Sequence, residues 1–229
     1  MMPCTRGREP DLLSREGEQI GRRYTADRRD DPGARFKWPS RAGRSLHEVV
    51  REALAEMTAG HCSYCDGHPL GETSPETVDH FRPKSQPRFY DLVCAWTNLF
   101  LSCARCNHAK REQWDDALLR PDDPEFRFER YFEVRFDSGE LQPAAAASPE
   151  DQHRARRTIA ILDLNREATV KSRLRFAKWM RTAGAIDEAD DAWPYRYLLP
   201  LCRVRADDSD VRARFSAVWA EIELAEAAE

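Results

Sequence analysis

The stretch that decides the fold is residues 61–112, which read HCSYCDGHPLGETSPETVDHFRPKSQPRFYDLVCAWTNLFLSCARCNHAKRE. It opens with Cys62-x-x-Cys65 and closes with Cys103-x-x-Cys106, and 37 residues separate the two pairs. Two C-x2-C knuckles are typical of a tetrahedral Zn²⁺ site, in which four thiolates leave no open position for catalysis. We therefore expect a structural zinc that staples the first knuckle to the start of a helix.

The insert between the knuckles supplies the elements for a compact metal-binding unit. Thr77–Phe81 is predicted as a short strand, and 92–100 as a second strand or buried segment. A helix is predicted from about Asn107 to Leu119, where prolines follow. The predicted order of elements is strand, loop, helix.

Three residues of this unit carry candidate chemistry. Asp79 and Asn107 offer hard oxygen ligands suited to Mg²⁺ or Mn²⁺. His80 has the side chain that takes a proton from water near neutral pH. Because neighbouring strand residues point to opposite faces, Asp79 and His80 share one site only if the chain bends there.

These residues resemble the HNH (ββα-metal) endonuclease family. The matching residues are Cys62-x-x-Cys65, Val78-Asp79-His80-Phe81-x-Pro83, Asn98-Leu99 and Cys103-x-x-Cys106-Asn107-x-x-Lys110. The resemblance implies that His80 is the general base and that Asp79 and Asn107 hold the catalytic metal. It further implies a supporting role for Asn98 and a contact between Lys110 and the scissile phosphate. Arg82 and Lys84 are candidate contacts to the DNA backbone.

A looser resemblance covers most of the chain. Arg6-x-x-x-Pro10-x-Leu12, Trp96-x-Asn98-Leu99 and Ile159-x-x-Leu162-x-Leu164-Asn165-Arg166 look like the HNH nuclease subunit of Septu-type and retron-associated anti-phage systems. This resemblance implies that the protein works with an ABC/SMC-like ATPase subunit.

Composition and charge set the frame for these motifs. The chain has 229 residues, 41% hydrophobic and 33% charged, which is enough for one large domain or two small ones. No apolar run approaches 18 residues and the first ten residues contain no signal core, so we expect a cytoplasmic protein without a membrane span. The net charge is −4, but residues 151–183 carry nine basic against three acidic residues. That excess is either a solvated helical surface or a docking face for DNA or an acidic partner.

We predict an α+β, mostly helical fold in three parts. Residues 1–44 form an irregular arm that is a candidate partner-docking segment, 45–125 form the nuclease core, and 126–229 form a β-hairpin followed by helices. The core begins with a helix capped by the Ser45–Glu48 capping box. The other predicted elements are a hairpin over 126–142 and helices over about 150–162, 166–182 and 208–227.

The predicted function is metal-dependent hydrolysis of DNA phosphodiester bonds by His80, Asn98 and Lys110, as part of an anti-phage complex with the ATPase. Two alternatives remain open at this stage. One is a free-standing restriction-type HNH endonuclease, although no base-reading motif is evident. The other is a non-catalytic zinc module that binds nucleic acid or protein.

Overall fold

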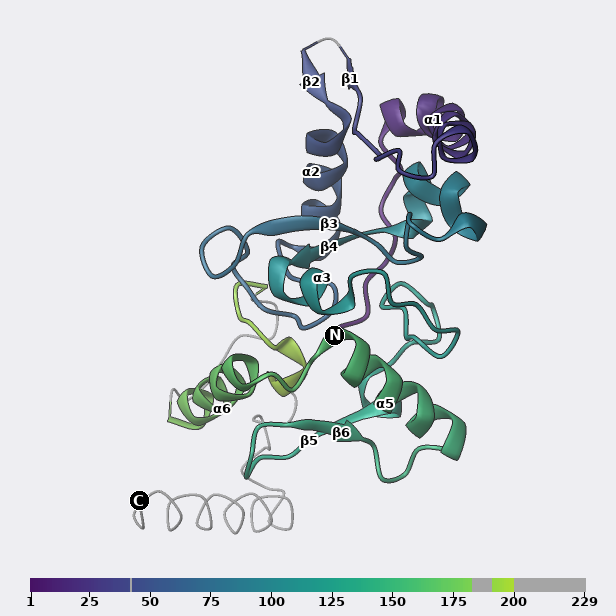
Figure 1. Ribbon diagram of the computed structural model, residues 1–229. Coiled ribbons are helices and arrows are strands. Elements are labelled where there is room, and N and C mark those ends of the chain that lie inside the picture. Colours follow the sequence, from purple (N-terminus) through teal and green to yellow (C-terminus); the bar gives the residue numbers. More distant parts are fainter. Residues whose placement is uncertain (42, 183–190, 200–229) are drawn as a thin grey trace.

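A two-stranded antiparallel sheet and a short helix form the centre of the protein (Figure 1). In the computed structural model, which describes residues 1–41, 43–182 and 191–199, β3 (Glu76–His80) pairs with β4 (Leu99–Cys103). The register places His80 opposite Leu99 and Glu76 opposite Cys103. Helix α3 (Ala104–Lys110) follows β4 directly, so the order strand, strand, helix matches the expected core.

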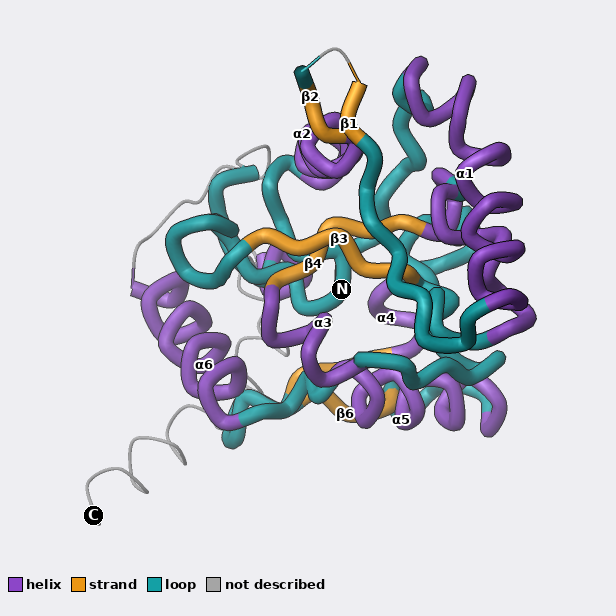
Figure 2. The backbone as a smooth tube through the Cα atoms, turned by 45° about the horizontal axis from the view of Figure 1, so that its top comes forward, coloured by secondary structure: helices purple, strands orange, loops and turns teal. Residues whose placement is uncertain are grey.

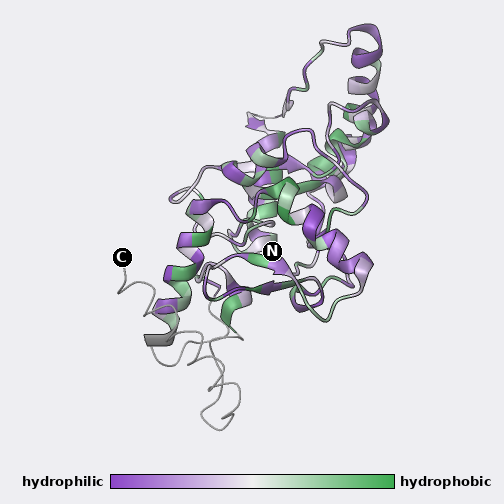
Figure 3. Cartoon of the chain, turned by 60° about the horizontal axis from the view of Figure 1, so that its bottom comes forward, coloured by the Kyte–Doolittle hydropathy of each residue, from purple (hydrophilic) through white to green (hydrophobic). Residues whose placement is uncertain are grey.

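Burial of the whole of β4 anchors this unit. Every residue from Leu99 to Cys103 is buried, because α2 (Leu46–Thr58) and further segments cover both faces of the short sheet. The predicted capping box at the start of α2 is present, with Ser45 as N-cap and the Glu48 carboxylate accepting from the Ser45 amide. Figure 3 shows that hydrophobic residues gather in the central strands, whereas the outer helices are largely hydrophilic.

The N-terminal segment differs from the irregular arm predicted for 1–44, because Asp11–Asp30 form the 20-residue helix α1. Two glycines within this segment lower its helix propensity, and for that reason the helix was not predicted from the sequence. The packing requires both, because α1 lies against the 3₁₀ helix η1 (Pro87–Cys94). A Cβ on Gly21 would come within 2.3 Å of the Asp91 carbonyl oxygen, and one on Gly17 within 3.0 Å of that of Cys94.

Two elements of the core have bounds that differ from the prediction. The segment 92–100 is mainly 3₁₀ helix, with η2 (Trp96–Asn98) after η1, and the strand begins only at Leu99. Helix α3 stops at Lys110 rather than near Leu119, because Arg111 leaves the helical conformation with a positive φ of 47°. Neither difference affects the two C-x2-C pairs.

The remaining elements lie on either side of this centre (Figure 2). The strands β1 (Ser40–Arg41) and β2 (Arg44–Ser45) precede α2, and α4 (Phe128–Tyr131) leads into β5 (Phe132–Val134). The predicted hairpin is present as β5 paired with β6 (Leu141–Pro143), but the first part of the predicted range 126–142 contains helix α4 and not a strand. The helices α5 (Pro149–Leu162) and α6 (Glu167–Thr182) and the 3₁₀ helix η3 (Arg196–Leu198) follow. The helix expected at 208–227 lies outside the described residues.

The fold class is therefore mixed α+β, as predicted, with small two-stranded sheets among more numerous helices. Within the described ranges, no helix combines the length and the apolarity that crossing a bilayer requires.

Candidate metal and catalytic site

The four cysteines of the two knuckles converge in one buried cluster. Their Sγ atoms all lie within 4.8 Å of one another, and the Cys65 and Cys103 sulfurs are 3.9 Å apart. The first pair lies in the turn after α2, and the second pair spans the end of β4 and the start of α3. Backbone amides point at the sulfurs, with Cys103 N donating to Cys62 Sγ at 3.3 Å and Cys106 N to Cys103 Sγ at 3.4 Å. This is a site that can hold a metal ion.

Arg166 contacts the cysteine cluster, and the spacing of the C-x2-C pairs did not predict this contact. Its guanidinium donates to Cys106 Sγ at 3.3 Å and to Cys103 Sγ at 3.8 Å from the junction between α5 and α6. Such a cation offsets the charge of clustered thiolates, and the same thiolates raise the pKa of Arg166 above its usual range against the effect of burial. The only signal in the sequence was the Leu164-Asn165-Arg166 motif, which gave no indication of this contact.

The other motif residues have structural partners. Arg6 donates to the carbonyl oxygens of Leu99, at 2.7 Å, and Trp96, at 3.1 Å, and forms an ion pair with Asp122 at 2.8 Å. The Asn165 amide makes two hydrogen bonds to the backbone of Leu141. These polar side chains fix the N-terminal segment and β6 to the rest of the protein.

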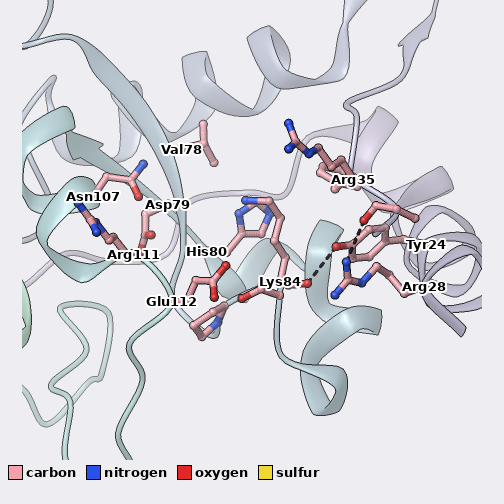
Figure 4. A pocket seen from close by; sticks show the side chains of 14 residues that line it. Tyr24, Arg28, Arg35, Val78, Asp79, His80, Lys84, Asn107, Arg111 and Glu112 are labelled. Atoms are coloured by element: carbon pink, nitrogen blue, oxygen red, sulfur yellow. Dashed lines mark hydrogen bonds between the residues drawn. The ribbon is translucent and has the colours of Figure 1, made fainter. Parts of the chain in front are cut away.

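Three of the predicted site residues line a single cavity of about 360 Å³. Figure 4 shows Asp79 and Asn107 next to each other on one side of this cavity and His80 in its middle. Asp79 and His80 therefore reach one site although they are neighbours on a strand, since β3 ends at His80. On the opposite side the cavity is closed by Tyr24, Arg28 and other residues of the N-terminal segment.

The orientation of His80 is set by one hydrogen bond. Nε2 lies 2.9 Å from the Val93 carbonyl oxygen, which can only accept, so Nε2 carries the proton and Nδ1 keeps its lone pair. Within the described part of the chain, Nδ1 has no hydrogen-bond partner. Burial lowers the pKa of His80 to about 3, and the nearby Lys84 and Lys110 act in the same direction. The imidazole is thus neutral, with an unprotonated Nδ1.

Asp79 is a buried carboxylate held by two partners. The Tyr64 hydroxyl donates to Oδ2 at 2.5 Å, and the Lys110 ammonium lies 3.2 Å from Oδ1 and 3.1 Å from Oδ2. Tyr64 was not anticipated from the sequence, where nothing distinguishes it from a core aromatic residue. Both partners fix the position of the Asp79 carboxylate.

Lys110 does not occupy the position expected of a phosphate contact. Its side chain is fully buried, and besides Asp79 it donates to the His80 carbonyl oxygen at 2.7 Å. Lys110 does not line the cavity, because its ammonium is held beside Asp79 and the end of β3. The geometry fits a residue that positions Asp79 and the end of β3.

Asn107 presents a free oxygen on the same side as Asp79. Its Nδ2 donates to Thr77 Oγ1 at 3.0 Å, which orients the amide, and its Oδ1 has no hydrogen-bond partner among the described residues. One carboxylate and one amide oxygen form a hard donor set, which suits Mg²⁺ or Mn²⁺ with water completing the shell. The residues present therefore fit a catalytic metal.

Asn98 lies outside the cavity and joins two parts of the loop that carries His80. Its Oδ1 accepts from the Arg82 amide at 2.8 Å, and its Nδ2 donates to the carbonyl oxygens of Arg82 and Leu92, each at 3.1 Å. Leu92 directly precedes Val93, the acceptor for His80, so the geometry agrees with a supporting role. Of the two candidate backbone contacts, Lys84 lines the cavity and Arg82 does not.

Comparison with known proteins gives a family for this segment. Residues 62–113 match the family model described as HNH endonuclease. Septu protein PtuB of Bacillus mycoides (strain KBAB4) is 35% identical over 78 residues, which cover 29% of this chain and 26% of that protein. Septu protein PtuB of Bacillus thuringiensis is 39% identical over 61 residues, covering 27% and 23%.

The chain thus spans about a quarter of the length of the curated relatives that it matches. The matched family segment begins at the first knuckle and ends just beyond α3, so it contains the cysteine cluster, both strands and every predicted site residue. Fold and match agree, because residues 62–113, which match the HNH endonuclease family model, contain two strands followed by a helix.

Proposed function

We propose that this protein is a metal-dependent endonuclease that hydrolyses DNA phosphodiester bonds. The observation that carries the proposal is the bond from His80 Nε2 to the Val93 carbonyl, which leaves Nδ1 as the unprotonated nitrogen in a cavity that Asp79 and Asn107 also line. A neutral imidazole fixed in this tautomer is suited to act as a general base.

In the proposed reaction a water molecule attacks phosphorus in line with the leaving oxygen. His80 Nδ1 accepts a proton from that water, the new P–O bond forms, and the bond to the 3′-oxygen breaks. Asp79 and Asn107 would hold Mg²⁺ or Mn²⁺, which when bound stabilises negative charge on the phosphate and the leaving oxygen. The negative phosphate beside His80 would also raise its pKa towards neutrality, which favours proton uptake during the reaction.

Lys110 and Asn98 act through other residues in this proposal. Lys110 holds the Asp79 carboxylate in place at the cavity through their 3.1 Å ion pair. Asn98 holds the backbone on both sides of the loop that aims His80. Both are positioning residues rather than groups that touch the substrate.

We further propose that the four cysteines hold a structural Zn²⁺. The support is the chemistry of four converging thiolates, which fill a tetrahedral shell and leave no position for substrate. The zinc would fix the end of β4 and the start of α3, and hence the distance between Asp79 and Asn107. Metal analysis of the purified protein, expected to give one zinc per chain, tests this assignment.

The biological setting that we propose is anti-phage defence with an ATPase partner. One support is the partial similarity to two relatives named Septu protein PtuB. The other is the balanced charge of the core, since residues 61–114 include six basic and six acidic residues. Weak intrinsic affinity for phosphates suits a nuclease whose access to DNA a partner controls. Co-expression with an ATPase encoded next to this protein and size-exclusion chromatography test the complex, and two separate peaks would count against it.

A plasmid-nicking assay tests the catalytic proposal. We expect the wild-type protein to nick supercoiled DNA with Mg²⁺ and to lose activity in EDTA. His80→Ala should reduce the rate by about 10² to 10⁴, the usual contribution of a general base. His153→Ala, an exposed histidine outside the HNH domain, serves as the matched control and should leave the rate unchanged.

Two outcomes would contradict the proposal. Equal nicking by wild type and His80→Ala removes His80 from the chemistry. No nicking with Mg²⁺ or Mn²⁺, with or without the ATPase, favours the non-catalytic binding module instead.

A further inference from the structure

We propose that the N-terminal segment 20–41, which lies outside the HNH domain, binds the phosphate backbone of the DNA strand that the cavity cleaves. The inference rests on the proposed function and extends it to residues that no family match covers. It starts from the surface around the cavity, where this segment forms one wall.

Three hollows join into one continuous track. The catalytic cavity shares Tyr24, Arg35 and Phe36 with a second hollow of about 330 Å³ on the N-terminal segment. On its other side it shares Lys84 and Arg111 with a shallow third hollow of about 910 Å³ along α3. The catalytic cavity thus lies between the two other hollows.

Basic side chains predominate along this track. Its titratable lining includes only three acids, Asp27, Asp79 and Glu112. The basic residues, which we call the basic track, are Arg23, Arg28, Arg35, Lys37, Arg41, Lys84 and Arg111. An excess of four positive charges stands out on a protein whose net charge is −4.

Most of these cations are not neutralised by the protein. Among the described residues, the only member of the basic track that forms an ion pair with a carboxylate is Arg41, with Glu16 at 2.9 Å. By contrast, Arg22, next to Arg23 on α1, forms an ion pair with Glu18 at 3.2 Å. Cations that are left without carboxylates along a groove are available to neutralise phosphates and release counterions.

The wall that carries these charges is held against the catalytic residues. The Tyr24 hydroxyl donates to the Lys84 carbonyl oxygen at 3.1 Å, and the Phe36 ring meets Tyr24 edge-on at 5.5 Å. Trp38 stacks on the His80 imidazole with 6.0 Å between ring centroids. Figure 4 shows Arg28 and Arg35 across the cavity from Asp79. A strand bound by this wall would therefore be oriented for attack beside His80.

In the other basic region of the chain, several cations have partners within the protein. In 151–181, Arg157 pairs with Asp115 at 2.7 Å and Lys171 with Glu167 at 2.6 Å. Arg173 is fully buried, and Arg166 binds the cysteine cluster. Several of the cations that made this region a candidate docking face are therefore paired or buried within the protein. The basic track is the stronger candidate for a phosphate-binding surface.

Binding of fluorescein-labelled DNA, measured by anisotropy over a series of salt concentrations, tests the inference. Every variant is made in the His80→Ala background so that cleavage does not interfere. We expect Arg23→Ala/Arg35→Ala/Lys37→Ala to weaken binding about tenfold or more and to lower the slope of log K against log salt by about 2 to 3. Arg22→Ala, a neighbour on α1 outside the track, should change neither quantity. Unchanged circular dichroism and zinc content show that the variants fold.

The outcomes separate this inference from the proposed function. A triple variant that binds like Arg22→Ala overturns the inference even if nicking depends on His80. Loss of binding in the triple variant supports the inference even if wild type never nicks DNA. Displacement of the DNA by polyglutamate at equal charge concentration, lost in the same variant, would assign the track to an acidic protein partner and overturn it.

Discussion

Replacing Lys110 by methionine tests the central electrostatic feature of the site. The ammonium is fully buried and lies 3.1 Å from Asp79 Oδ2, and the carboxylate is almost as deeply buried. Methionine keeps most of the volume of the side chain and removes its charge. The variant therefore leaves the Asp79 carboxyl in the core with Tyr64 as its remaining partner.

The expected cost follows from this geometry. Two unit charges 3.1 Å apart attract by about 5 kcal/mol at an effective dielectric constant of 20. Removing one partner of a buried pair typically costs about 3–5 kcal/mol, because the other charge is stranded. Asp79→Asn added to Lys110→Met removes the stranded charge, so the double variant should recover a large part of the loss.

Urea unfolding followed by tryptophan fluorescence, at a fixed concentration of free Zn²⁺ and without Mg²⁺, measures these free energies. We expect a coupling energy above about 1.5 kcal/mol in the double-mutant cycle. Lys171→Met is the control, because its pair with Glu167 is exposed and should contribute little to stability.

A coupling energy near zero would refute the reasoning, since it would mean that Lys110 does not hold Asp79 in the folded protein. If Lys110→Met fails to fold, folding of the double variant is itself the expected rescue. Failure of the double variant to fold better than the single one would be equally damaging.

Three further predictions concern the scaffold of the site. Gly21→Ala should lower the free energy of unfolding by about 1–3 kcal/mol despite its gain in helix propensity, because the new Cβ would meet the Asp91 carbonyl oxygen at 2.3 Å. Gly7→Ala, whose new Cβ would make only ordinary contacts, is the control. A Gly21→Ala variant that is more stable than wild type in thermal unfolding would contradict the packing of α1 on η1. Arg166→Gln should accelerate the release of metal to a chromogenic chelator, because the thiolates lose their cationic donor; release at the rate of Arg156→Gln, an exposed arginine on α5, would argue against that role. Acid unfolding should detect the contribution of Asp122 to stability. Burial alone would raise the pKa of its carboxyl, but the hydrogen bonds from Arg120 and Arg6 hold that pKa below its ordinary value of 3.8. A depressed pKa stabilises the fold above that ordinary value and the stabilisation is lost as the pH falls further, so wild type should lose stability more steeply than Asp122→Asn below about pH 4, and parallel curves would exclude this contribution.

Local spacing explains why part of the site was predictable. The C-x2-C pairs, the adjacent Asp79 and His80, and Asn107 directly after the last cysteine each place donors through short stretches of backbone. The capping box at Ser45 and the hairpin with its turn at Gly139 are equally local. Such features depend on a few dihedral angles, so their consequences can be read along the chain.

Contacts between distant segments explain what was missed. Gly17 and Gly21 weaken the helical pattern of α1, and only the close approach of η1 shows why they are there. Lys110 has the sequence position of a phosphate contact, but its ammonium is captured by Asp79, 31 residues away. The donation from Arg166 to the cysteines joins residues 60 or more positions apart. No periodicity or spacing records these partners.

The amino-acid sequence by itself determined which chemistry this protein can carry, because thiolates, hard oxygens and an imidazole are properties of residue types at short spacing. Only the tertiary structure decided which of the charged residues face the cavity and which support it from within. The reason is physical: whether a cation remains free for phosphate or is neutralised in the core depends on packing between segments far apart in the chain, as the contrast between the exposed Arg35 and the buried Lys110 demonstrates.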